Sequence, residues 1–373
     1  MKYKTLDDFN FRGKRVLVRS DLNSPVVKGR VINNSRIEES ALTIAELKRK
    51  GAKVVILAHQ SRPSAKDFIS LKQHAKLLNK YSEVKFVDDI IGKKAVREIL
   101  KLKNSETLLL ENVRFLKEEF SEKRGNALID VLGNLCEIYV NDAFSVSHRV
   151  QSSVTDFPKV MSSCVGRLME KEIESLGKLK KGRGLFILGG AKIEDDLKLA
   201  NKWNRVLACG MFGQLELVKR GFDLGKDLRK FRNVTIGKNV VFPVDFAFEE
   251  NGKRKEFRSD EFARGMKILD IGSETVTRYV EEIRKAKFVF MKGPAGFFED
   301  GRFSFGTNEL LKAVSKCGAF SVLGGGHLTV ALDKIGISKK KFGYVSLSGG
   351  ALIAYLAGEK LPGLEALKRG SDN

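Results

Sequence analysis

The chain has 373 residues, of which 42% are hydrophobic, and it carries 68 Lys and Arg against 46 Asp and Glu, a formal net charge of +22. This length fits two domains, because domains typically contain about 100 to 150 residues. The four cysteines lie far apart without a Cys-x-x-Cys pair, which argues against a disulfide framework or a zinc knuckle. No stretch approaches the roughly 18 continuous apolar residues of a membrane span, and residues 1–11 are polar and charged. We therefore expect a cytoplasmic protein.

The excess of positive charge raises the local concentration of any anion, whether nucleic acid, anionic membrane or small phosphorylated metabolite. The basic residues are spread along the whole chain, with only short clusters such as 339–341. Aromatic residues do not interleave with them as a base-stacking platform requires. We therefore interpret most of the excess as a solvated basic surface, and we expect neither a membrane nor a nucleic acid as a partner.

In chain order, the first half contains four apolar runs that each end in charged or polar residues, and they lie at 16–23, 54–62, 108–114 and 138–143. Amphipathic stretches, such as 36–50 and 71–80, separate them. This alternation is typical of a doubly wound parallel α/β sheet. Further along, 164–180 places its apolar residues on one helical stripe, which predicts a helix that joins two lobes.

The second half contains five apolar runs that end at glycines, and they lie at 186–190, 206–210, 268–272, 288–293 and 322–326. Ligands of open α/β sheets bind outside the carboxyl ends of parallel strands. The residues that follow each run are therefore expected to contact substrate. One lobe offers arginines there, whereas the other offers glycine turns and the free N–H groups of helix N-termini.

Four arginines stand at or just after the polar strand ends of the first half, and each has a planar fork that can hold a phosphate or carboxylate through two hydrogen bonds. Any one of them alone would be read as a surface charge. Together they indicate a substrate with more than one negative group. Asp21 and Asn23 cannot attract an anion, so we expect them to accept hydrogen bonds from a substrate hydroxyl. The anion-binding candidates are Arg36, Arg62, Arg114 and Arg149, with His59 as a shorter donor.

The second half has no Gly-x-x-x-x-Gly-Lys-Ser/Thr motif and no His-Arg-Asp kinase loop. Glycine pairs alone are weak indications of a nucleotide site. The sequence from Gly189 to Lys192 is a stronger one, because the lysine comes at the start of a predicted helix, where it can reach a phosphate held by the helix end.

Ordered motifs make the chain resemble phosphoglycerate kinases over essentially its whole length. In the first half they are SDLNSP at 20–25, NSRI at 34–37, AHQSRP at 58–63, LENVRF at 110–115, and NDAF at 141–144 followed by His148 and Arg149. In the second half they are GGAK at 189–192, DIG at 270–272, GPAGFFE at 293–299, GGG at 324–326 and SGGA at 348–351.

The resemblance implies transfer of a phosphoryl group between 1,3-bisphosphoglycerate and ADP, which gives 3-phosphoglycerate and ATP, with Mg²⁺ held mainly through the nucleotide phosphates. It implies a monomer, although a dimer stays open. Phosphoglycerate would bind to Asp21, Leu22, Asn23, Arg36, His59, Gln60, Ser61, Arg62, Arg114 and Arg149. The nucleotide would bind to Gly190, Lys192, Glu299, Gly325, Gly326, His327 and Leu328. Arg36 and Lys192 are the candidates that neutralise charge during transfer.

These inferences give an α/β protein of two doubly wound, Rossmann-like parallel-sheet lobes joined by a helix. The first lobe is expected at 1–160, the connecting helix at 161–180 and the nucleotide lobe at 181–349. The resemblance adds a C-terminal segment, 350–373, that packs back on the first lobe.

Three positions depart from the common family pattern. His327 stands where many members have an aspartate beside the metal, so either phosphates and water hold Mg²⁺, which we expect, or Asp195 substitutes. Asp196 stands where a second lysine is common, and Ser348 alters the last glycine run. A noncatalytic relative that binds nucleotide or nucleic acid therefore stays open, and strongly salt-dependent nucleic-acid binding without kinase activity would indicate it.

Overall fold

The chain folds into two compact units, which a computed structural model describes over residues 3–121, 125–181, 184–261 and 266–369. One unit comprises 1–173 with 359–373, and the other comprises 174–358. Each has its own six-stranded sheet in which every pair of neighbouring strands is parallel. This confirms the predicted α/β class with two Rossmann-like lobes.

The sheet of the first unit has the strand order β5-β6-β4-β1-β7-β8. Its strands are β1 (Arg15–Ser20), β4 (Lys53–Leu57), β5 (Lys85–Phe86), β6 (Thr107–Leu109), β7 (Ile138–Asp142) and β8 (Ser162–Val165). From β1 the chain builds outward first through β4 and later through β7, so the direction of winding changes between β1 and β7. Ligands of such sheets bind where the winding changes, at the carboxyl ends of the strands.

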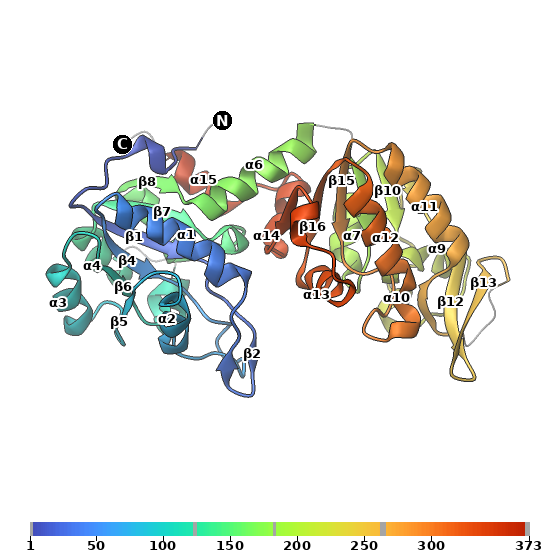
Figure 1. Cartoon of the computed structure of the whole chain (residues 1–373), viewed down its shortest axis with the longest axis horizontal. Coiled ribbons are helices and arrows are strands. Elements are labelled where there is room, and N and C mark those ends of the chain that lie inside the picture. The colour runs from blue at the N-terminus through green and yellow to red at the C-terminus, as the bar shows by residue number, and fades with distance from the viewer. Residues whose placement is uncertain (1–2, 122–124, 182–183, 262–265, 370–373) are drawn as a thin grey trace. The chain divides into compact units, whose positions relative to one another are not determined.

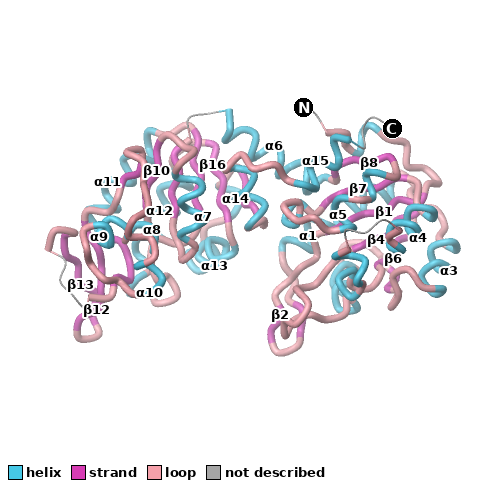
Figure 2. The backbone as a smooth tube through the Cα atoms, turned by 180° about the vertical axis from the view of Figure 1, so that it is seen from behind, coloured by secondary structure: helices cyan, strands magenta, loops and turns pink. Residues whose placement is uncertain are grey.

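Helices cover both faces of this first sheet, as Figures 1 and 2 show from opposite sides. Helix α1 lies in front in Figure 1, and α5 lies in front in Figure 2. The Asn34 side chain caps α1 by accepting the Arg36 N–H at 2.8 Å, which fixes the position of Arg36 at the start of the helix. The helices of this unit are α1 (Ser35–Arg49), α2 (Lys72–Leu78), α3 (Lys93–Lys101), α4 (Ala127–Leu135), α5 (Ser152–Thr155) and α15 (Pro362–Arg369).

The C-terminal segment that returns to the first unit begins at Glu359, whereas the sequence placed its start at Gly350. The difference arises because α14 (Gly350–Leu356) packs against α7 (Ile193–Ala200) of the second unit. The return itself is anchored by the Gly363 N–H, which donates to the Ser147 carbonyl at 2.9 Å.

The connecting segment is a strand followed by a helix, whereas the sequence predicted one helix from Cys164. Cys164 lies in β8, whose pairing with β7 buries its side chain, and the helix α6 (Arg167–Lys181) starts three residues later. A Cβ at Gly166 would lie 2.3 Å from Asp142 Oδ1, so the chain can only turn there without a side chain. Asp142 Oδ1 also accepts the Met169 N–H at 3.1 Å, and burial raises the pKa of Asp142 to about 7.

The sheet of the second unit has the order β11-β10-β9-β15-β16-β17. Its winding changes between β9 and β15, because β10 lies on one side of β9 and β16 lies beyond β15. The strands are β9 (Leu185–Leu188), β10 (Arg205–Ala208), β11 (Val240–Val241), β15 (Phe288–Lys292), β16 (Phe320–Gly324) and β17 (Tyr344–Ser346).

The apolar run 268–272 does not join this parallel sheet, which corrects the prediction. It forms β14 (Ile268–Ile271), which pairs antiparallel with β12 (Asp245–Glu250) in a small sheet completed by β13 (Lys253–Arg258). Phe246 and Phe257 pack together in the core of this extension. An apolar run of this length predicts a strand but does not specify which neighbour the strand pairs with.

Helices also cover both faces of the second sheet, with α11 and α12 in front in Figure 1 and α7 in front in Figure 2. The principal helices are α7, α11 (Ser273–Lys285), α12 (Phe305–Lys316), α13 (Gly326–Ile335) and α14. Within the described residues, no helix combines the length and the apolar character needed to cross a membrane.

Candidate active site

The arginines predicted from the sequence gather at the carboxyl edge of the first sheet, around His59. The electrostatic neighbours of His59 are Arg19, Arg114, Arg36 and Arg149. Arg62 in turn influences both Arg114 and Arg149, whose pKa values are lowered by burial and by the neighbouring arginines. Like charges held this closely repel one another, so an anion that binds among them relieves the repulsion.

His59 is neutral in this setting. It follows β4 and is only 3% exposed, and burial together with the surrounding guanidinium groups holds its pKa well below the usual value. Arg19 Nη2 lies 3.1 Å from His59 Nδ1. A guanidinium group can only donate, so Nδ1 accepts and the ring proton is on Nε2. His59 can therefore donate a hydrogen bond from Nε2 without adding another positive charge.

Arg19 was not among the predicted site residues, yet it is fully buried at the end of β1. Its Nε donates to Ser153 Oγ at 2.8 Å, and Ser153 Oγ donates to Glu119 Oε1 at 2.8 Å. Glu119 is also fully buried, and burial raises its pKa although Arg19 opposes the shift. Ser153 and Glu119 are far from Arg19 in sequence, and the only local signal was an arginine inside an otherwise apolar strand.

Asp21 and Arg36 form an ion pair at the switch point of the first sheet. The Asp21 side chain is only 4% exposed and that of Arg36 is 21% exposed, so the guanidinium is the part that solvent or a ligand reaches. Asp21 Oδ1 is buried and has no hydrogen-bond partner among the described residues. That oxygen is the kind of acceptor that the sequence analysis assigned to a substrate hydroxyl.

Ser61 connects several of the other predicted residues. Its backbone has φ +59°, in the left-handed region that is costly for a residue with a side chain. Three hydrogen bonds stabilise this conformation: Ser61 N–H donates to Asn23 Oδ1 at 2.8 Å, Ser61 Oγ donates to Asp67 at 2.6 Å, and Arg114 Nη1 donates to the Ser61 carbonyl at 2.5 Å. The loop thus holds Arg114 beside the strand ends. Asn23 Oδ1, which was expected to accept from a substrate hydroxyl, accepts from the Ser61 N–H instead.

The remaining predicted residues of this edge differ in what they offer to a ligand. Leu22 is fully buried in the core, and both polar atoms of Gln60 are engaged with the backbone of Ser24 at 3.0 Å. Arg62 is exposed, and Arg149 is half-buried. The arginines and His59 are therefore the groups that the structure presents most directly.

In the second unit, three glycine turns lock together at the carboxyl ends of β9, β10 and β15. Gly190 N–H donates to the Pro294 carbonyl at 2.8 Å, Gly210 N–H donates to the Ala295 carbonyl at 3.0 Å, and Met211 N–H donates to the Gly190 carbonyl at 3.0 Å. A Cβ at Gly189 would lie 2.5 Å from the Pro294 carbonyl oxygen. These glycines permit loop-to-loop packing, so their N–H groups are not available to a phosphate as the sequence suggested.

Replacing Gly293 by alanine should therefore destabilise the second unit. Gly293 has φ +71°, and a Cβ there would lie 2.2 Å from the Gly189 carbonyl oxygen. Backbone strain and overpacking together should lower the free energy of unfolding by about 3 kcal/mol. Urea denaturation would measure the change, with Gly301→Ala as control, because a Cβ at Gly301 meets nothing within 4 Å. Equal stability of the two variants would contradict the packing argument.

The turns that precede α13 and α14 are more open. No atom lies within 4 Å of a Cβ built at Gly325, Gly326 or Gly349. Gly325 has φ +104°, and it directly precedes the first residue of α13, a helix whose N-terminal N–H groups need partners. Among the predicted glycines, Gly325 and Gly326 are thus the ones with room for a phosphate.

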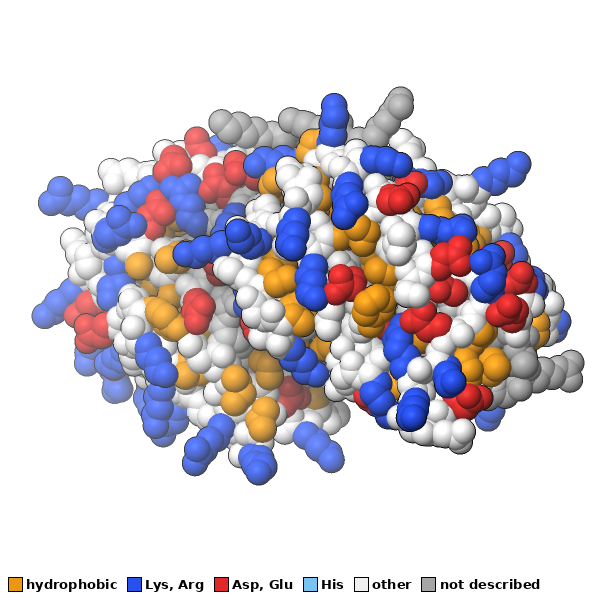
Figure 3. Space-filling view, turned by 45° about the vertical axis from the view of Figure 1, so that its right-hand side comes forward, with side chains coloured by type: hydrophobic (Ala, Val, Ile, Leu, Met, Phe, Trp, Pro, Cys, Tyr) orange, Lys and Arg blue, Asp and Glu red, His pale blue; other side chains and the backbone are white. Residues whose placement is uncertain are grey.

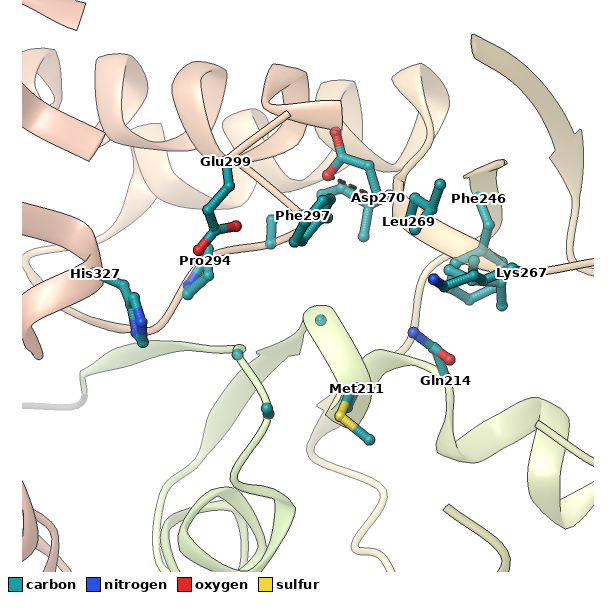
Figure 4. Close-up of a pocket in the computed structure, with 17 residues that line it drawn as sticks. Met211, Gln214, Phe246, Lys267, Leu269, Asp270, Pro294, Phe297, Glu299 and His327 are labelled. Atoms are coloured by element: carbon teal, nitrogen blue, oxygen red, sulfur yellow. Dashed lines mark hydrogen bonds between the residues drawn. The ribbon is translucent and has the colours of Figure 1, made fainter. Parts of the chain in front are cut away.

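A cavity of about 450 Å³ lies beside the locked turns, and most of its lining is apolar. In Figure 4, Met211 and Gln214 approach from one side, and Phe297 faces them from the other. Predicted residues Gly190, Glu299 and His327 line it, whereas Lys192, Gly325, Gly326 and Leu328 do not. Sequence reasoning missed its apolar and amide lining, which includes Met211, Gln214, Phe246, Leu269, Pro294 and Phe297.

Lys192 lies at the open edge of the same loops, directly before α7. Its side chain is exposed and has no ion-pair partner among the described residues. Cys209 is buried beside the turns, and burial raises the pKa of its thiol, as expected for a small apolar residue with no reactive role.

Protein side chains alone do not make a metal site in the parts of the chain that the structure describes, where no three His, Cys, Asp or Glu side chains are grouped to hold an ion. His327 is exposed at the start of α13, and an imidazole is a poor ligand for Mg²⁺, which prefers oxygen. Asp195 is half-buried in the first turn of α7. A magnesium ion here would need oxygen ligands that a bound nucleotide supplies.

Comparisons with known proteins agree with this architecture. A profile described as phosphoglycerate kinase matches residues 6–359. The phosphoglycerate kinase of Aeropyrum pernix is 42% identical over 97% of this chain and 95% of its own, and that of Methanothermus fervidus is 39% identical over 98% and 97%. The crystal structure of phosphoglycerate kinase from Pyrococcus horikoshii superposes with a TM-score of 0.86 at 35% identity, covering 98% of this chain and 99% of that one. The chain therefore belongs to the phosphoglycerate kinase family, the phosphotransferases that use a carboxyl group as acceptor.

Proposed function

We propose that the arginine-lined edge of the first unit binds 3-phosphoglycerate and 1,3-bisphosphoglycerate, and that the cavity and open turns of the second unit bind ADP and ATP. The observation that carries this assignment is the group of arginines around a neutral, buried His59, an arrangement that suits a ligand with more than one negative charge. The apolar cavity of the second unit suits an aromatic base instead.

In the first unit, Arg62, Arg114 and Arg149 would hold the phosphate of phosphoglycerate, and His59 would donate from Nε2. The buried Asp21 Oδ1 would accept a hydrogen bond from the substrate hydroxyl. Asn23, Gln60 and Ser61 would shape the loops that carry these groups, as their hydrogen bonds support, and Leu22 would anchor its loop in the core.

In the second unit, the base would lie between Met211 and Phe297, and Glu299 would accept from the ribose hydroxyls. The phosphates would lie over the open turn formed by Gly325, Gly326 and His327 at the start of α13, where Leu328 anchors the helix in the core. The α13 N-terminus would supply N–H donors there.

The reaction needs no covalent enzyme intermediate, because the acyl phosphate is already activated and ADP supplies the attacking oxygen. Catalysis then consists of aligning the two substrates and stabilising charge on the transferring group. Arg36 and Lys192 would provide that charge. Because the substrates bind to different units, closure about α6 would bring them together and would exclude the water that hydrolyses acyl phosphates.

Magnesium would neutralise the nucleotide phosphates when it is bound with them. The nucleotide oxygens and water would be its main ligands, with His327 in the place of a usual aspartate. We propose that the protein acts as a monomer in the cytoplasm.

A binding experiment on two variants tests the assignment of each substrate to a unit. Arg62→Ala should weaken binding of 3-phosphoglycerate by at least tenfold and leave ATP binding unchanged. Lys192→Ala should do the reverse. Isothermal titration calorimetry of each ligand with and without Mg²⁺ would measure both. If either variant weakens the other ligand instead, or if neither ligand binds the folded protein, the proposal is wrong.

A further inference from the structure

A second lysine lies at the carboxyl edge of the second sheet, next to Lys192. Lys292 is the last residue of β15, and its Nζ donates to Asp196 Oδ1 at 2.6 Å and to the Lys192 carbonyl at 3.4 Å. Asp196 belongs to the first turn of α7 and its side chain is fully buried, whereas the Lys292 side chain is 12% exposed. The sequence motif had offered Lys192 alone as the cation of this edge.

The position of this ion pair is set by the sheet topology. Lys192 follows β9 and Lys292 ends β15, and the winding of the sheet changes between these two strands. The crevice at such a point is where ligands of open α/β sheets bind. The Gly189 N–H donates to the Lys292 carbonyl at 2.8 Å, so the locked turns fix the backbone of Lys292 rigidly at this crevice.

The ammonium group keeps one donor for a ligand. It has three N–H donors, and within the described residues the Asp196 carboxylate and the Lys192 carbonyl are its partners. The third donor has no protein acceptor there, and the partial exposure of the side chain gives a ligand access to it.

The surroundings of the Asp196 carboxylate argue against a purely structural role. Its Oδ2 is buried without a hydrogen-bond partner, and burial raises its pKa to about 7 although Lys292 opposes the shift. A buried ion pair is often no more stable than a pair of apolar side chains. The ion pair therefore adds little to the stability of the fold, but it holds the Lys292 ammonium group rigidly beside the crevice.

We propose that Lys292 is a second phosphate-contacting lysine of the phosphoryl-transfer site, and that Asp196 is the positioning residue that holds it there. The inference rests on the proposed placement of the nucleotide phosphates at this edge. It assigns to β15 the cationic role that sequence reasoning looked for on α7, where Asp196 stands in place of a lysine.

The test compares the kinetics of variants that remove or move the charges of this ion pair. Lys292→Met combined with Asp196→Asn removes both charges, Asp196→Asn alone keeps the ammonium, and Asp196→Lys combined with Lys292→Asn moves the ammonium to α7. Lys312→Met is the matched control, because Lys312 pairs with Glu309 on the exposed face of α12. Lys192→Met tests the phosphate placement itself, and thermal unfolding checks that each variant is folded.

The neutral double variant should lose at least thirtyfold in kcat/KM for ATP with an unchanged KM for 3-phosphoglycerate. Asp196→Asn should stay within tenfold of the parent, and the lysine-relocated variant should recover most of the loss. The inference fails if the neutral double variant stays within threefold of the parent, or if Asp196→Asn loses as much as the double variant. When Lys192→Met also has no effect, the proposed phosphate placement fails as well; when Lys192→Met is impaired, only the role of Lys292 fails.

A measurement on the unmodified sequence covers the case in which a variant does not fold. Limited acetylation followed by mass spectrometry should show that ATP with Mg²⁺ protects Lys192 and Lys292 at least fivefold and leaves Lys312 unchanged. Equal labelling of Lys292 with and without nucleotide would overturn the inference.

Discussion

Arg36→Ala is expected to lower kcat by about 10³-fold while ATP binding stays unchanged. Removing one preorganised donor from a site where charge develops typically costs about 10² to 10³ in rate. Arg36 is fixed at the first turn of α1 by the Asn34 cap and by Asp21, so its guanidinium is already ordered for the role that we propose. The rate can be followed by coupling formation of 1,3-bisphosphoglycerate to NADH oxidation through glyceraldehyde-3-phosphate dehydrogenase.

Two further variants show whether the loss concerns charge or geometry. Arg36→Lys keeps the charge but loses the planar fork, and we expect an intermediate loss. Arg49→Ala removes an exposed arginine at the other end of the same helix and should be as active as the parent. An Arg36→Ala protein that is folded and retains a tenth of the parental kcat would show that Arg36 does not neutralise the transferring group.

Arg19→Met should lower the free energy of unfolding by about 3 to 5 kcal/mol, because it removes the nearest compensating charge of the buried Glu119. Arg19→Met combined with Glu119→Gln should recover much of this loss, since no buried charge then remains unpaired. Urea denaturation of the three proteins measures the effect, with the exposed Arg30→Met as control. A double variant as unstable as Arg19→Met would mean that packing, not charge, governs the site.

The same substitution should make stability depend more strongly on pH. The pKa of Glu119 is raised by burial, and loss of Arg19 should raise it further. A carboxyl group with a raised folded pKa stabilises the fold below its unfolded pKa and loses that contribution as the pH rises through the folded value. The deficit of Arg19→Met should therefore shrink as the pH is lowered from 8 towards 5, and a constant deficit would argue against an unpaired carboxylate.

The sequence predicted well those features that depend on residues close together in the chain. Arg114 and His59 follow apolar runs, and parallel pairing brings all such ends to one edge, so their meeting could be expected. The partners of Arg19 could not be predicted, because Ser153 and Glu119 approach it only after the sheet has formed. The run ending at Gly272 had the right pattern for a strand, but its antiparallel partner β12 was not specified by that pattern.

The glycines illustrate the same limit. Gly190 and Gly325 both follow apolar runs, and the sequence analysis assigned both to the nucleotide site. Both also have positive φ in the structure. Only the packing distinguishes the two glycines, since the Gly190 turn is locked between neighbouring loops whereas the turn at Gly325 faces open space.

The basic residues are not confined to the motifs, because Lys and Arg side chains are scattered across the whole face shown in Figure 3.

The locking of the loops after β9, β10 and β15 through main-chain hydrogen bonds has a consequence for how this site can change over time. The shape of those loops depends on glycines and carbonyl groups and hardly at all on the side chains that the loops carry. The exposed side chains at 192 and 327 can then be exchanged while the crevice keeps its form. In such a site the main chain determines the shape of the crevice, and the side chains that border it can change without altering that shape.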